Sequence, residues 1–212
     1  MERGRGVIAS ERKTQMHMAA PRLIVGISGA SGAIYGHAAL KALRGAGVET
    51  HLVISRSGQI TIAHELKIKI SELSALADVV YRVDDIGAAI SSGSFPTMGM
   101  LVAPCSIRTL AEIATGVTSS LLTRAADVVL KERRRLVLMV RETPFHLGHL
   151  RSMTQVTEMG AIVMPPVPAF YACPVTIEDI VNHSIGRALD LFGLNNDLTF
   201  RWGESIGIGS TR

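Results

Sequence analysis

The stretch from residue 23 to residue 36 constrains the fold more than any other part of the chain, and it reads Leu-Ile-Val-Gly-Ile-Ser-Gly-Ala-Ser-Gly-Ala-Ile-Tyr-Gly. Residues 23–27 are mostly large and aliphatic, which is typical of a parallel strand buried on both faces. The small residues at 28–32 favour a tight turn, and a helix-like run begins at Ala33. The stretch therefore predicts a strand, a tight turn and a helix, the opening unit of an α/β fold.

The turn at 28–32 has the composition of an anion-binding loop. Its small residues let the backbone approach a ligand closely. The N–H groups at the start of the helix, together with the hydroxyls of Ser28 and Ser31, would then face a negative charge, so we predict a phosphate site. The alternative is a turn selected only for close packing of the helix against the sheet.

The spacing of the glycines indicates which phosphate the turn would hold. The dinucleotide pattern G-x-G-x-x-G is not met, and the next predicted strand ends in Ser55 rather than in an acid that could bind a ribose. No G-K-[ST] follows the loop, so the P-loop interpretation also fails. A mononucleotide such as FMN fits this turn better. The glycines in question are Gly26, Gly29, Gly32 and Gly36.

The composition argues against several classes of protein. No apolar run reaches about 18 residues and no signal-peptide pattern opens the chain, so we expect neither a membrane span nor export. Two cysteines, Cys105 and Cys173, give no disulfide framework, which favours the reducing cytoplasm. Basic residues are not interleaved with the scarce aromatic ones, at 4% of the chain, so nucleic-acid binding is not supported.

Three parts are predicted along the 212 residues. Residues 1–20 carry part of the net charge of +4 without hydrophobic periodicity, which predicts a disordered basic extension. Residues 21–202 are expected to form a single flavin-binding α/β domain. Residues 203–212 are rich in Gly and Ser and are expected to form a mobile tail.

Strand-like and helix-like runs alternate through the predicted domain. Strands are predicted at residues 23–27, 50–54, 79–83, 100–103, 136–140 and 161–164. Helices are predicted at residues 33–44, 57–65, 71–77, 84–90, 106–115, 119–133, 146–159 and 176–192. This alternation predicts a doubly wound parallel sheet with helices on both faces, a Rossmann-like three-layer sandwich.

Polar groups gather immediately after the predicted strands. In a parallel sheet the carboxyl ends of all strands lie along one edge, where ligands bind. We therefore expect these groups to contribute to a common site. They are Ser28 and Ser31, Ser55, the Pro104-Cys105-Ser106 segment, the Arg141-Glu142 pair, and Tyr171 in a proline-rich loop.

Two of these strand ends are candidates for chemistry. Ser106 and the three residues after it open a helix and would form a second anion site, although Ser106 would serve equally as an ordinary N-cap. Arg141 can hold an anion or a carbonyl oxygen with its planar guanidinium. Glu142 can exchange a proton if burial raises its pKa. The alternative for this pair is a local ion pair.

For other charged residues the sequence does not distinguish a binding role from a surface role. Arg124, Asp127 and Lys131 lie at i, i+3 and i+7 on one predicted helix face, which is more typical of a solvated stripe. Arg187 lies midway along a mostly apolar helix, where a buried guanidinium would need an anion. The alternative for both Arg187 and Tyr171 is an ordinary surface role.

Metal and cysteine chemistry are not favoured. His146 and His149 are spaced i, i+3 without a Cys or carboxylate cluster, so a metal site is not expected, and His149 is interpreted as a packing or capping residue. Cys105 follows a proline but has no histidine in a defined relation to it, which favours a small buried thiol.

With these residues described, the chain closely resembles the flavin prenyltransferase (UbiX-like) family, whose members were formerly called 3-octaprenyl-4-hydroxybenzoate carboxy-lyase or phenylacrylic acid decarboxylase small subunit. The resemblance runs from residue 22 to residue 202. The matching segments are Gly-Ile-Ser-Gly-Ala-Ser-Gly-Ala-Ile-Tyr-Gly at 26–36, Ser-Ser-Gly-Ser at 91–94, Pro-Cys-Ser at 104–106, Leu-Thr-Arg-Ala-Ala-Asp-Val-Val-Leu-Lys-Glu-Arg at 122–133, Arg-Glu-Thr-Pro at 141–144 and Pro-Val-Pro-Ala-Phe-Tyr at 166–171.

The resemblance implies a flavodoxin-like fold and a metal-independent enzyme. The implied reaction transfers a dimethylallyl group from dimethylallyl phosphate to reduced FMN, giving prenylated FMN with a fourth ring across N5 and C6. The implied partners are a UbiD-type decarboxylase, which receives the product, and further copies of the chain in a dodecamer.

The resemblance also implies roles for individual residues. FMN would be held by Gly29, Ala30, Ser31, Ser55, Ser106, Ile107, Arg108, Thr109 and Arg141. The prenyl phosphate would be held by Arg124, Lys131, Tyr171 and Arg187, which favours a binding role for the charged stripe over a solvated one. Glu142 would manage the proton lost from the flavin ring, Glu65 would support the phosphate end, and Ser92 would lie beside the flavin and leaving group.

One segment departs from the family pattern. Some members carry an aromatic residue shortly before the Ser-Gly-Ser segment, where this chain has Asp-Asp-Ile-Gly at 84–87. Trp202 is therefore expected to supply part of the shielding of the prenyl group. Two other functions stay open from the sequence: a flavin-dependent cysteinyl decarboxylase, which would want a different segment at 165–171, and a non-catalytic FMN carrier, which would not need Glu142.

Overall fold

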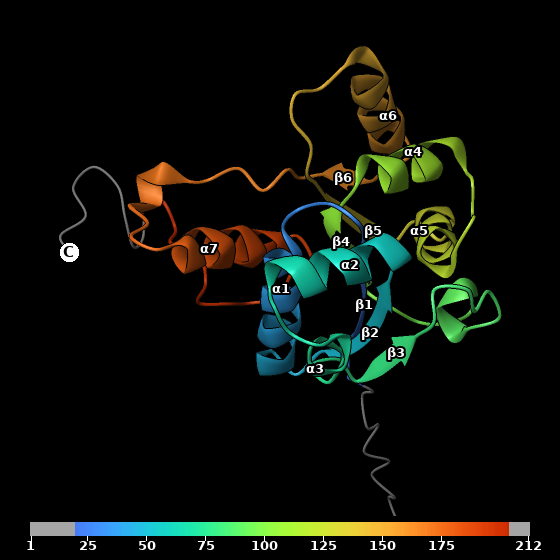
Figure 1. Ribbon diagram of the computed structural model, residues 1–212, viewed down its shortest axis with the longest axis horizontal. Coiled ribbons are helices and arrows are strands. Elements are labelled where there is room, and N and C mark those ends of the chain that lie inside the picture. Colours follow the sequence, from blue (N-terminus) through green and yellow to red (C-terminus); the bar gives the residue numbers. More distant parts are fainter. Residues whose placement is uncertain (1–19, 204–212) are drawn as a thin grey trace, which may run out of the picture.

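The computed structural model describes residues 20–203. In this part of the chain a six-stranded parallel sheet, in the order β3-β2-β1-β4-β5-β6, lies between helices (Figure 1). The doubly wound parallel sheet predicted from the alternation is therefore confirmed. The strands are β1 (Arg22–Ile27), β2 (Glu49–Ile54), β3 (Val79–Tyr81), β4 (Gly99–Cys105), β5 (Arg135–Val140) and β6 (Ile162–Val163).

The helices follow the predicted strands in the expected alternation. Their bounds are α1 (Ala33–Gly45), α2 (Arg56–Glu65), α3 (Ile70–Ser74), α4 (Ile107–Thr115), α5 (Leu121–Lys131), α6 (Leu147–Glu158) and α7 (Ile177–Asp190), with short 3₁₀ turns η1 (Ala89–Ser91) and η2 (Phe170–Ala172). None of the helices in this described part is long and apolar enough to cross a membrane.

The sheet separates two hydrophobic cores. Leu23, Val25 and Ile27 of β1 face the core formed with α1, α2, α3 and α7, whereas Ile24 faces the core formed with α4, α5 and α6. This alternation follows from the two-residue period of a strand, and both faces are apolar because both are covered. Each such side chain is worth about 1.5–3 kcal/mol when fully buried. The long aliphatic runs of the sequence thus determine the layered architecture.

The strand order reverses between β1 and β4. β1 pairs in parallel with β2 on one side and with β4 on the other, so the connections that follow β1 and β4 leave the sheet toward opposite faces. This is the topological switch point at which doubly wound sheets bind ligands. β4 continues through Pro104, beyond the predicted end at residue 103, and its register with β5 shifts between Val102 and Cys105. Pro104 offers no N–H to the ladder, which accounts for that irregularity.

Close packing around the switch point requires a glycine at position 36. A Cβ atom at Gly36 would lie 2.5 Å from the carbonyl oxygen of Ala103 and 2.6 Å from Cδ1 of Ile27. Helix α1 therefore contacts β4 more closely than any larger residue would allow. This packing brings the N-terminus of α1 to the edge of the sheet where the site lies.

The predicted helix at 84–90 is wrong. The segment forms turns that end in η1, with the N–H of Asp85 bonded to the carbonyl of Arg82 and that of Ala88 to Asp85. Asp84 instead pairs with Arg82 at 3.0 Å, and Gly87 weakens any helix there. α3 is also shorter than the helix predicted at 71–77.

The extension predicted at 1–20 and the tail predicted at 203–212 lie outside the described residues, except for residues 20 and 203.

Candidate active site

A pocket of about 310 Å³ opens at the carboxyl edge of the sheet, among the first turns of α2, α4 and α5. It brings together four residues that the sequence placed in one site, namely Ser55, Ser106, Arg108 and Thr109. Ser55 and Ser106 cap their helices, since their Oγ atoms accept the N–H groups of Gly58 at 2.9 Å and Thr109 at 3.2 Å. Ser106 therefore caps its helix and also lines the pocket, so the two interpretations of this residue are compatible.

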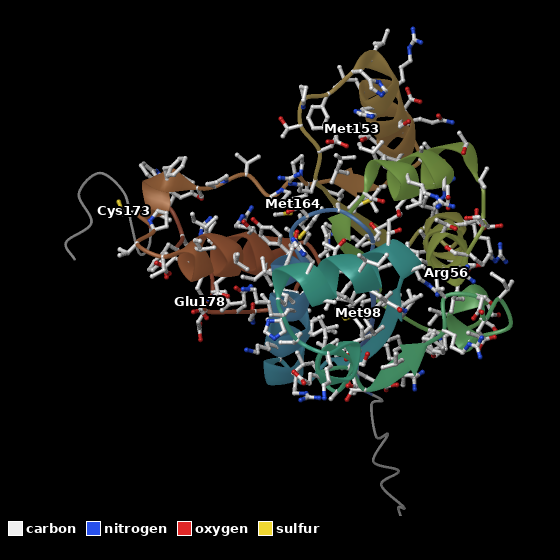
Figure 2. All side chains as sticks on the ribbon, viewed as in Figure 1. Arg56, Met98, Met153, Met164, Cys173 and Glu178 are labelled. Carbon is white, nitrogen blue, oxygen red and sulfur yellow. The ribbon has the colours of Figure 1, made fainter. Side chains whose placement is uncertain are left out.

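Sequence reasoning missed part of the pocket wall. Arg56 and Ser57 extend the strand end that was identified only through Ser55, and Figure 2 shows Arg56 at the end of α2 that faces α5. Ser119, Ser120 and Thr123 contribute further hydroxyls. Ser120 is also the N-cap of α5, since its side chain accepts the N–H of Thr123. The density of Ser and Thr after strands and before helices was the signal available for the hydroxyl residues, whereas Arg56 was marked only by its place next to Ser55.

The pocket wall carries both signs of charge. Arg108 Nε donates to Glu112 Oε1 at 2.8 Å, and the same glutamate accepts the hydroxyl of Ser119 at 2.7 Å. Asp84 lies in the wall as well, and its pKa is lowered first by a hydrogen bond from Arg82 and also by the charge of Arg56. The groups that the pocket can offer to an anion are therefore mainly hydroxyls and helix N–H groups. Of its two arginines, Arg108 is paired with Glu112, and Arg56 is the less tightly paired.

Ser28 does not face an anion, which corrects the prediction for its hydroxyl. Its side chain is 1% exposed; Oγ donates to the carbonyl of Pro104 at 3.0 Å and accepts the N–H of Ser106 at 2.7 Å. Ser28 therefore joins the loop after β1 to the loop after β4. Gly29 brings a third loop into contact, since a Cβ there would lie 2.3 Å from Cβ of Ser57.

The N-terminus of α1 is not an open phosphate site, because the carboxylate of Glu65 already occupies it. Glu65 Oε2 accepts the N–H groups of Gly32 at 2.9 Å and Ala33 at 2.8 Å. Burial alone would raise the pKa of Glu65, but hydrogen bonds from Ser31, Gly32 and Ala33 and the charge of Arg141 outweigh it, so the pKa lies below its usual value. The predicted anion is thus a side chain of the protein itself.

Arg141 lies near this group, at the end of β5. Its N–H donates to the carbonyl of Cys105 at 3.0 Å, and its charge acts on both Glu65 and Tyr35. Glu142 Oε1 accepts the N–H of Thr143 at 2.9 Å. Among residues 20–203 no ion pair joins Arg141 to Glu142, so the alternative of a local pair is not found there.

The charged stripe on α5 forms ion pairs along the helix. Arg124 contacts Asp127 at 2.7 Å, as expected for an i, i+3 pair. Lys131 instead donates to Glu132 at 2.5 Å, and this pair lies against the loop that carries Ser92. The hydroxyls of Ser92 and Ser94 are 2.9 Å apart. Lys131 and Ser92, both implied by the resemblance, are therefore close in space.

Tyr171 and Trp202 form an aromatic group with His183. The hydroxyl of Tyr171 lies 3.3 Å from Nε2 of His183, and the ring of Tyr171 makes edge-to-face contacts with His183 and Trp202 at centroid distances of 5.7 and 5.8 Å. Arg187 is 48% exposed and pairs with Asp190 at 2.7 Å, so within the single chain it has the surface position that the sequence left open as the alternative to burial. It lies in the last turn of α7, where a cation complements the helix dipole.

One chain does not bring the Tyr171 group to the pocket. Figure 2 shows Cys173, at the end of η2, on the opposite side of the molecule from Arg56. The predicted common site is therefore divided within the single chain. The pocket and the Glu65–Arg141 group lie at the sheet edge, whereas Tyr171, Arg187 and Trp202 lie on the arm formed by η2 and α7.

Two further residues were placed by the structure. Burial raises the pKa of the Cys105 thiol, which fits a small buried side chain and not a nucleophile. His146, rather than His149, is the capping histidine, because its Nδ1 accepts the N–H of Gly148 at 3.0 Å at the start of α6.

Comparison with known proteins identifies the family of the chain. The sequence model of the Flavoprotein family matches residues 11–189. The flavin prenyltransferase UbiX of Thauera aromatica is 58% identical over 181 residues, covering 85% of this chain and 93% of that protein. The enzyme of the same name from Escherichia coli strain K12 is 57% identical over 184 residues, covering 85% and 97%.

Solved structures show the same likeness. AnUbiX (PadA1), in complex with FMN and dimethylallyl pyrophosphate, superposes with a TM-score of 0.86 at 49% identity, covering 87% of this chain and 98% of that one. A dodecameric FMN-dependent UbiX-like decarboxylase from Escherichia coli O157:H7 gives a TM-score of 0.83 at 49% identity, with coverage of 85% and 98%. The peptidyl-cysteine decarboxylase EpiD, at 18% identity and a TM-score of 0.56, shares the fold alone.

The flavodoxin-like fold implied by the resemblance is therefore confirmed, and the cysteinyl decarboxylase alternative is not favoured. The coverage extends over nearly all of both relatives, so the match concerns the whole domain and not a shared motif. The chain belongs to the Flavoprotein family and, within it, to the flavin prenyltransferases.

Proposed function

We propose that this chain transfers a dimethylallyl group from dimethylallyl phosphate to reduced FMN and so makes prenylated FMN. The observation that carries the proposal is the hydroxyl-lined pocket at the switch point, in a chain 58% identical to a flavin prenyltransferase. Reduced FMN would supply the electron-rich ring that captures the allyl group. The protein would bind, orient and shield the two reactants.

The pocket is proposed to take the phosphate and ribityl chain of FMN. Its donors are hydroxyls, the first turns of α2 and α4, and the guanidinium of Arg56, which together suit a phosphate without a metal. Arg141 and the turn at the start of α1 would hold the ring. The residues proposed to bind FMN are Gly29, Ala30, Ser31, Ser55, Ser106, Ile107, Arg108, Thr109 and Arg141.

The residues proposed for the prenyl phosphate come from two regions. Arg124 and Lys131 lie on α5, whereas Tyr171, Arg187 and Trp202 lie on the η2–α7 arm. We propose that neighbouring subunits bring these groups together in a dodecamer. The exposed apolar side chains of the arm support this assembly, since Val175 is 92% exposed and Phe170 75%.

The chemistry assigns a task to each charged group. Cationic side chains would neutralise the phosphate as it departs, in the position where other prenyltransferases use a metal ion. Glu142 would accept the proton lost from the flavin ring. Glu65 would act through Ser31, because its carboxylate holds the turn on which Ser31 lies, and Ser92 would lie beside the leaving group.

The direct test is anaerobic turnover. The protein is incubated with reduced FMN and dimethylallyl phosphate, and the mass of the extracted flavin is measured. A gain of one isoprenyl unit is expected, and no gain is expected with oxidised FMN. Unchanged FMN in the complete reaction would contradict the proposal and would favour a non-catalytic FMN carrier.

We further propose that the product passes to a UbiD-type decarboxylase in the cytoplasm. The two cysteines support a reducing compartment, because both Cys105 and Cys173 are free thiols. Adding the reaction mixture to a cofactor-free decarboxylase of that type should restore decarboxylation. A mixture made with the Lys131→Ala variant should restore less, and equal restoration by both mixtures would contradict the transfer.

A further inference from the structure

Arg134 fastens the loop that carries Ser92 to the end of α5. Its Nη1 donates to the carbonyl oxygen of Phe95 at 2.6 Å, and its Nη2 donates to the carbonyl oxygen of Gly93 at 2.7 Å. Arg134 is only partly exposed, so these bonds are partly shielded from water. A planar guanidinium that bonds two nearby carbonyls fixes both the position and the orientation of a loop.

Gly93 lies directly against the Lys131–Glu132 pair. A Cβ atom there would lie 2.1 Å from Oε1 of Glu132 and 2.8 Å from Nζ of Lys131. Lys131 Nζ in turn donates to Glu132 at 2.5 Å. The absence of a side chain at position 93 therefore allows the loop to contact the ammonium group and to limit where it can lie.

The side chain of Phe95, at the far end of the loop, has further contacts that do not involve Arg134. The ring of Phe95 makes an edge-to-face contact with His51 at a centroid distance of 4.9 Å, and the guanidinium of Arg22 lies 5.2 Å from the same ring. The loop thus has one anchor in the core and one on Arg134. Loss of Arg134 would free the part next to Lys131 while Phe95 stayed in place.

We propose that Arg134 and Gly93 are positioning residues, which set the place of the Lys131 ammonium and hold Ser92 beside it. Neither residue needs to touch the donor. Their effect acts through Lys131, a flexible side chain that would otherwise sample many rotamers. This inference deepens the proposed function and rests on it, since Lys131 is assigned there to the prenyl phosphate.

The first test compares Arg134 with its neighbour. Arg134→Met should raise KM for dimethylallyl phosphate about tenfold, because two charge-assisted hydrogen bonds are lost, while the affinity for FMN stays within about twofold. Arg134→Lys should recover part of the loss. Arg133→Met is the matched control, because Arg133 is exposed and should behave as the parent. An unchanged donor KM in Arg134→Met would overturn the proposal.

The second test moves Lys131 without touching Arg134. In Gly93→Ala the atoms nearest the new methyl are the mobile ends of Glu132 and Lys131, so the fold should persist and the donor KM should rise several-fold. Adding Glu132→Ala removes the closest contact and should lower the donor KM again. A Gly93→Ala enzyme with the parent's KM would count against the positioning role even if Arg134→Met proved unstable.

A binding measurement, which does not need turnover, separates this inference from the proposed function. Inorganic phosphate is titrated calorimetrically into the FMN-loaded protein, with Lys131→Ala as the reference for a lost ammonium. Weaker phosphate binding in Gly93→Ala and Arg134→Met supports the positioning role, even if the parent fails to prenylate FMN. Parent-like phosphate binding in both variants, with weakened binding in Lys131→Ala, overturns it while leaving the role of Lys131 intact.

Discussion

Oε2 of Glu65 accepts the N–H of Ala33 at 2.8 Å, so the last residue of α2 caps the first residue of α1. A carboxylate at a helix N-terminus is favoured both by the unsatisfied N–H groups and by the helix dipole. Because Ser31 bonds the same carboxylate, this contact also fixes the turn at which the ring of FMN is proposed to lie.

Replacing Glu65 should change stability in a pH-dependent way. The pKa of Glu65 is lowered in the fold, so its contribution is fully present above its unfolded pKa of about 4.3 and is lost as the pH falls through the lower folded value. Glu65→Gln keeps an acceptor but loses the charge, and should cost about 1 kcal/mol at pH 7 and less at pH 3. Urea unfolding at both pH values measures this, and an equal cost at both would contradict it.

Arg56 should affect the binding of FMN more than that of riboflavin. It is the pocket cation least engaged with other side chains, so Arg56→Gln should weaken FMN binding about tenfold and leave riboflavin binding unchanged. Arg151→Gln, an exposed change on α6, is the control. Titration of flavin fluorescence gives both affinities, and equal losses for the two flavins would exclude a phosphate contact.

Glu142→Gln should slow the reaction without loosening the flavin. The amide oxygen can still accept the N–H of Thr143, so the local geometry is kept while the base is lost. We expect kcat for prenylation to fall by about 10²–10⁴ and FMN affinity to stay the same. Glu158→Gln, at the exposed end of α6, controls for the change in net charge. Parent-like single-turnover rates would remove Glu142 from its proposed role.

His183 should make the fold less stable as the pH falls. Burial lowers its pKa, the charge of Arg187 lowers it further, and Asp190 acts in the opposite direction. The folded state therefore binds fewer protons than the unfolded state below about pH 6.5, and the free energy of unfolding falls there. His183→Gln should reduce this fall and preserve a partner for Tyr171, whereas the exposed His64→Gln should not. Unfolding curves between pH 5 and 8 test the difference.

Gly36 and Gly45 provide a matched pair within α1. Gly36→Ala would place a methyl against the Ala103 carbonyl and should cost about 1–3 kcal/mol. At Gly45 nothing lies within 4 Å of the added atom, so Gly45→Ala should be neutral or stabilise by up to about 1 kcal/mol. Thermal and urea unfolding give both values, and similar effects at the two sites would argue against the close contact of α1 with β4.

The layered fold was predictable because its signals are local. The four central strands contain aliphatic residues and are each followed by a polar residue, as in Ile54 followed by Ser55. The parallel order then brings those strand ends to one edge. The helix predicted at 84–90 was wrong because the helical spacing of its residues is weak and because Asp84 pairs with Arg82, two positions earlier. Competition between a local ion pair and a helix is hard to judge from residue types alone.

The site was less predictable because its decisive contacts are remote. Glu65 accepts the N–H of Gly32, which lies 33 positions earlier in the chain, and no periodicity in the sequence marks such a pair. Ser28 could not be separated from Ser31 by sequence, although only Ser28 points between two strands. The distance of Tyr171 from the pocket depends on how all the elements pack, which no local pattern reveals. Arg124 and Lys131, which are proposed to meet Tyr171, would come from a neighbouring subunit.

The hydroxyl of Ser28 has a mechanical consequence. It joins the loop after β1 to the end of β4, because its Oγ donates to the carbonyl oxygen of Pro104 and accepts the N–H of Ser106. The main-chain N–H of Ser28 also donates to the carbonyl oxygen of Pro104 at 3.1 Å, so three hydrogen bonds of one residue join the two loops. We therefore expect a ligand that displaces one of these loops to displace the other with it.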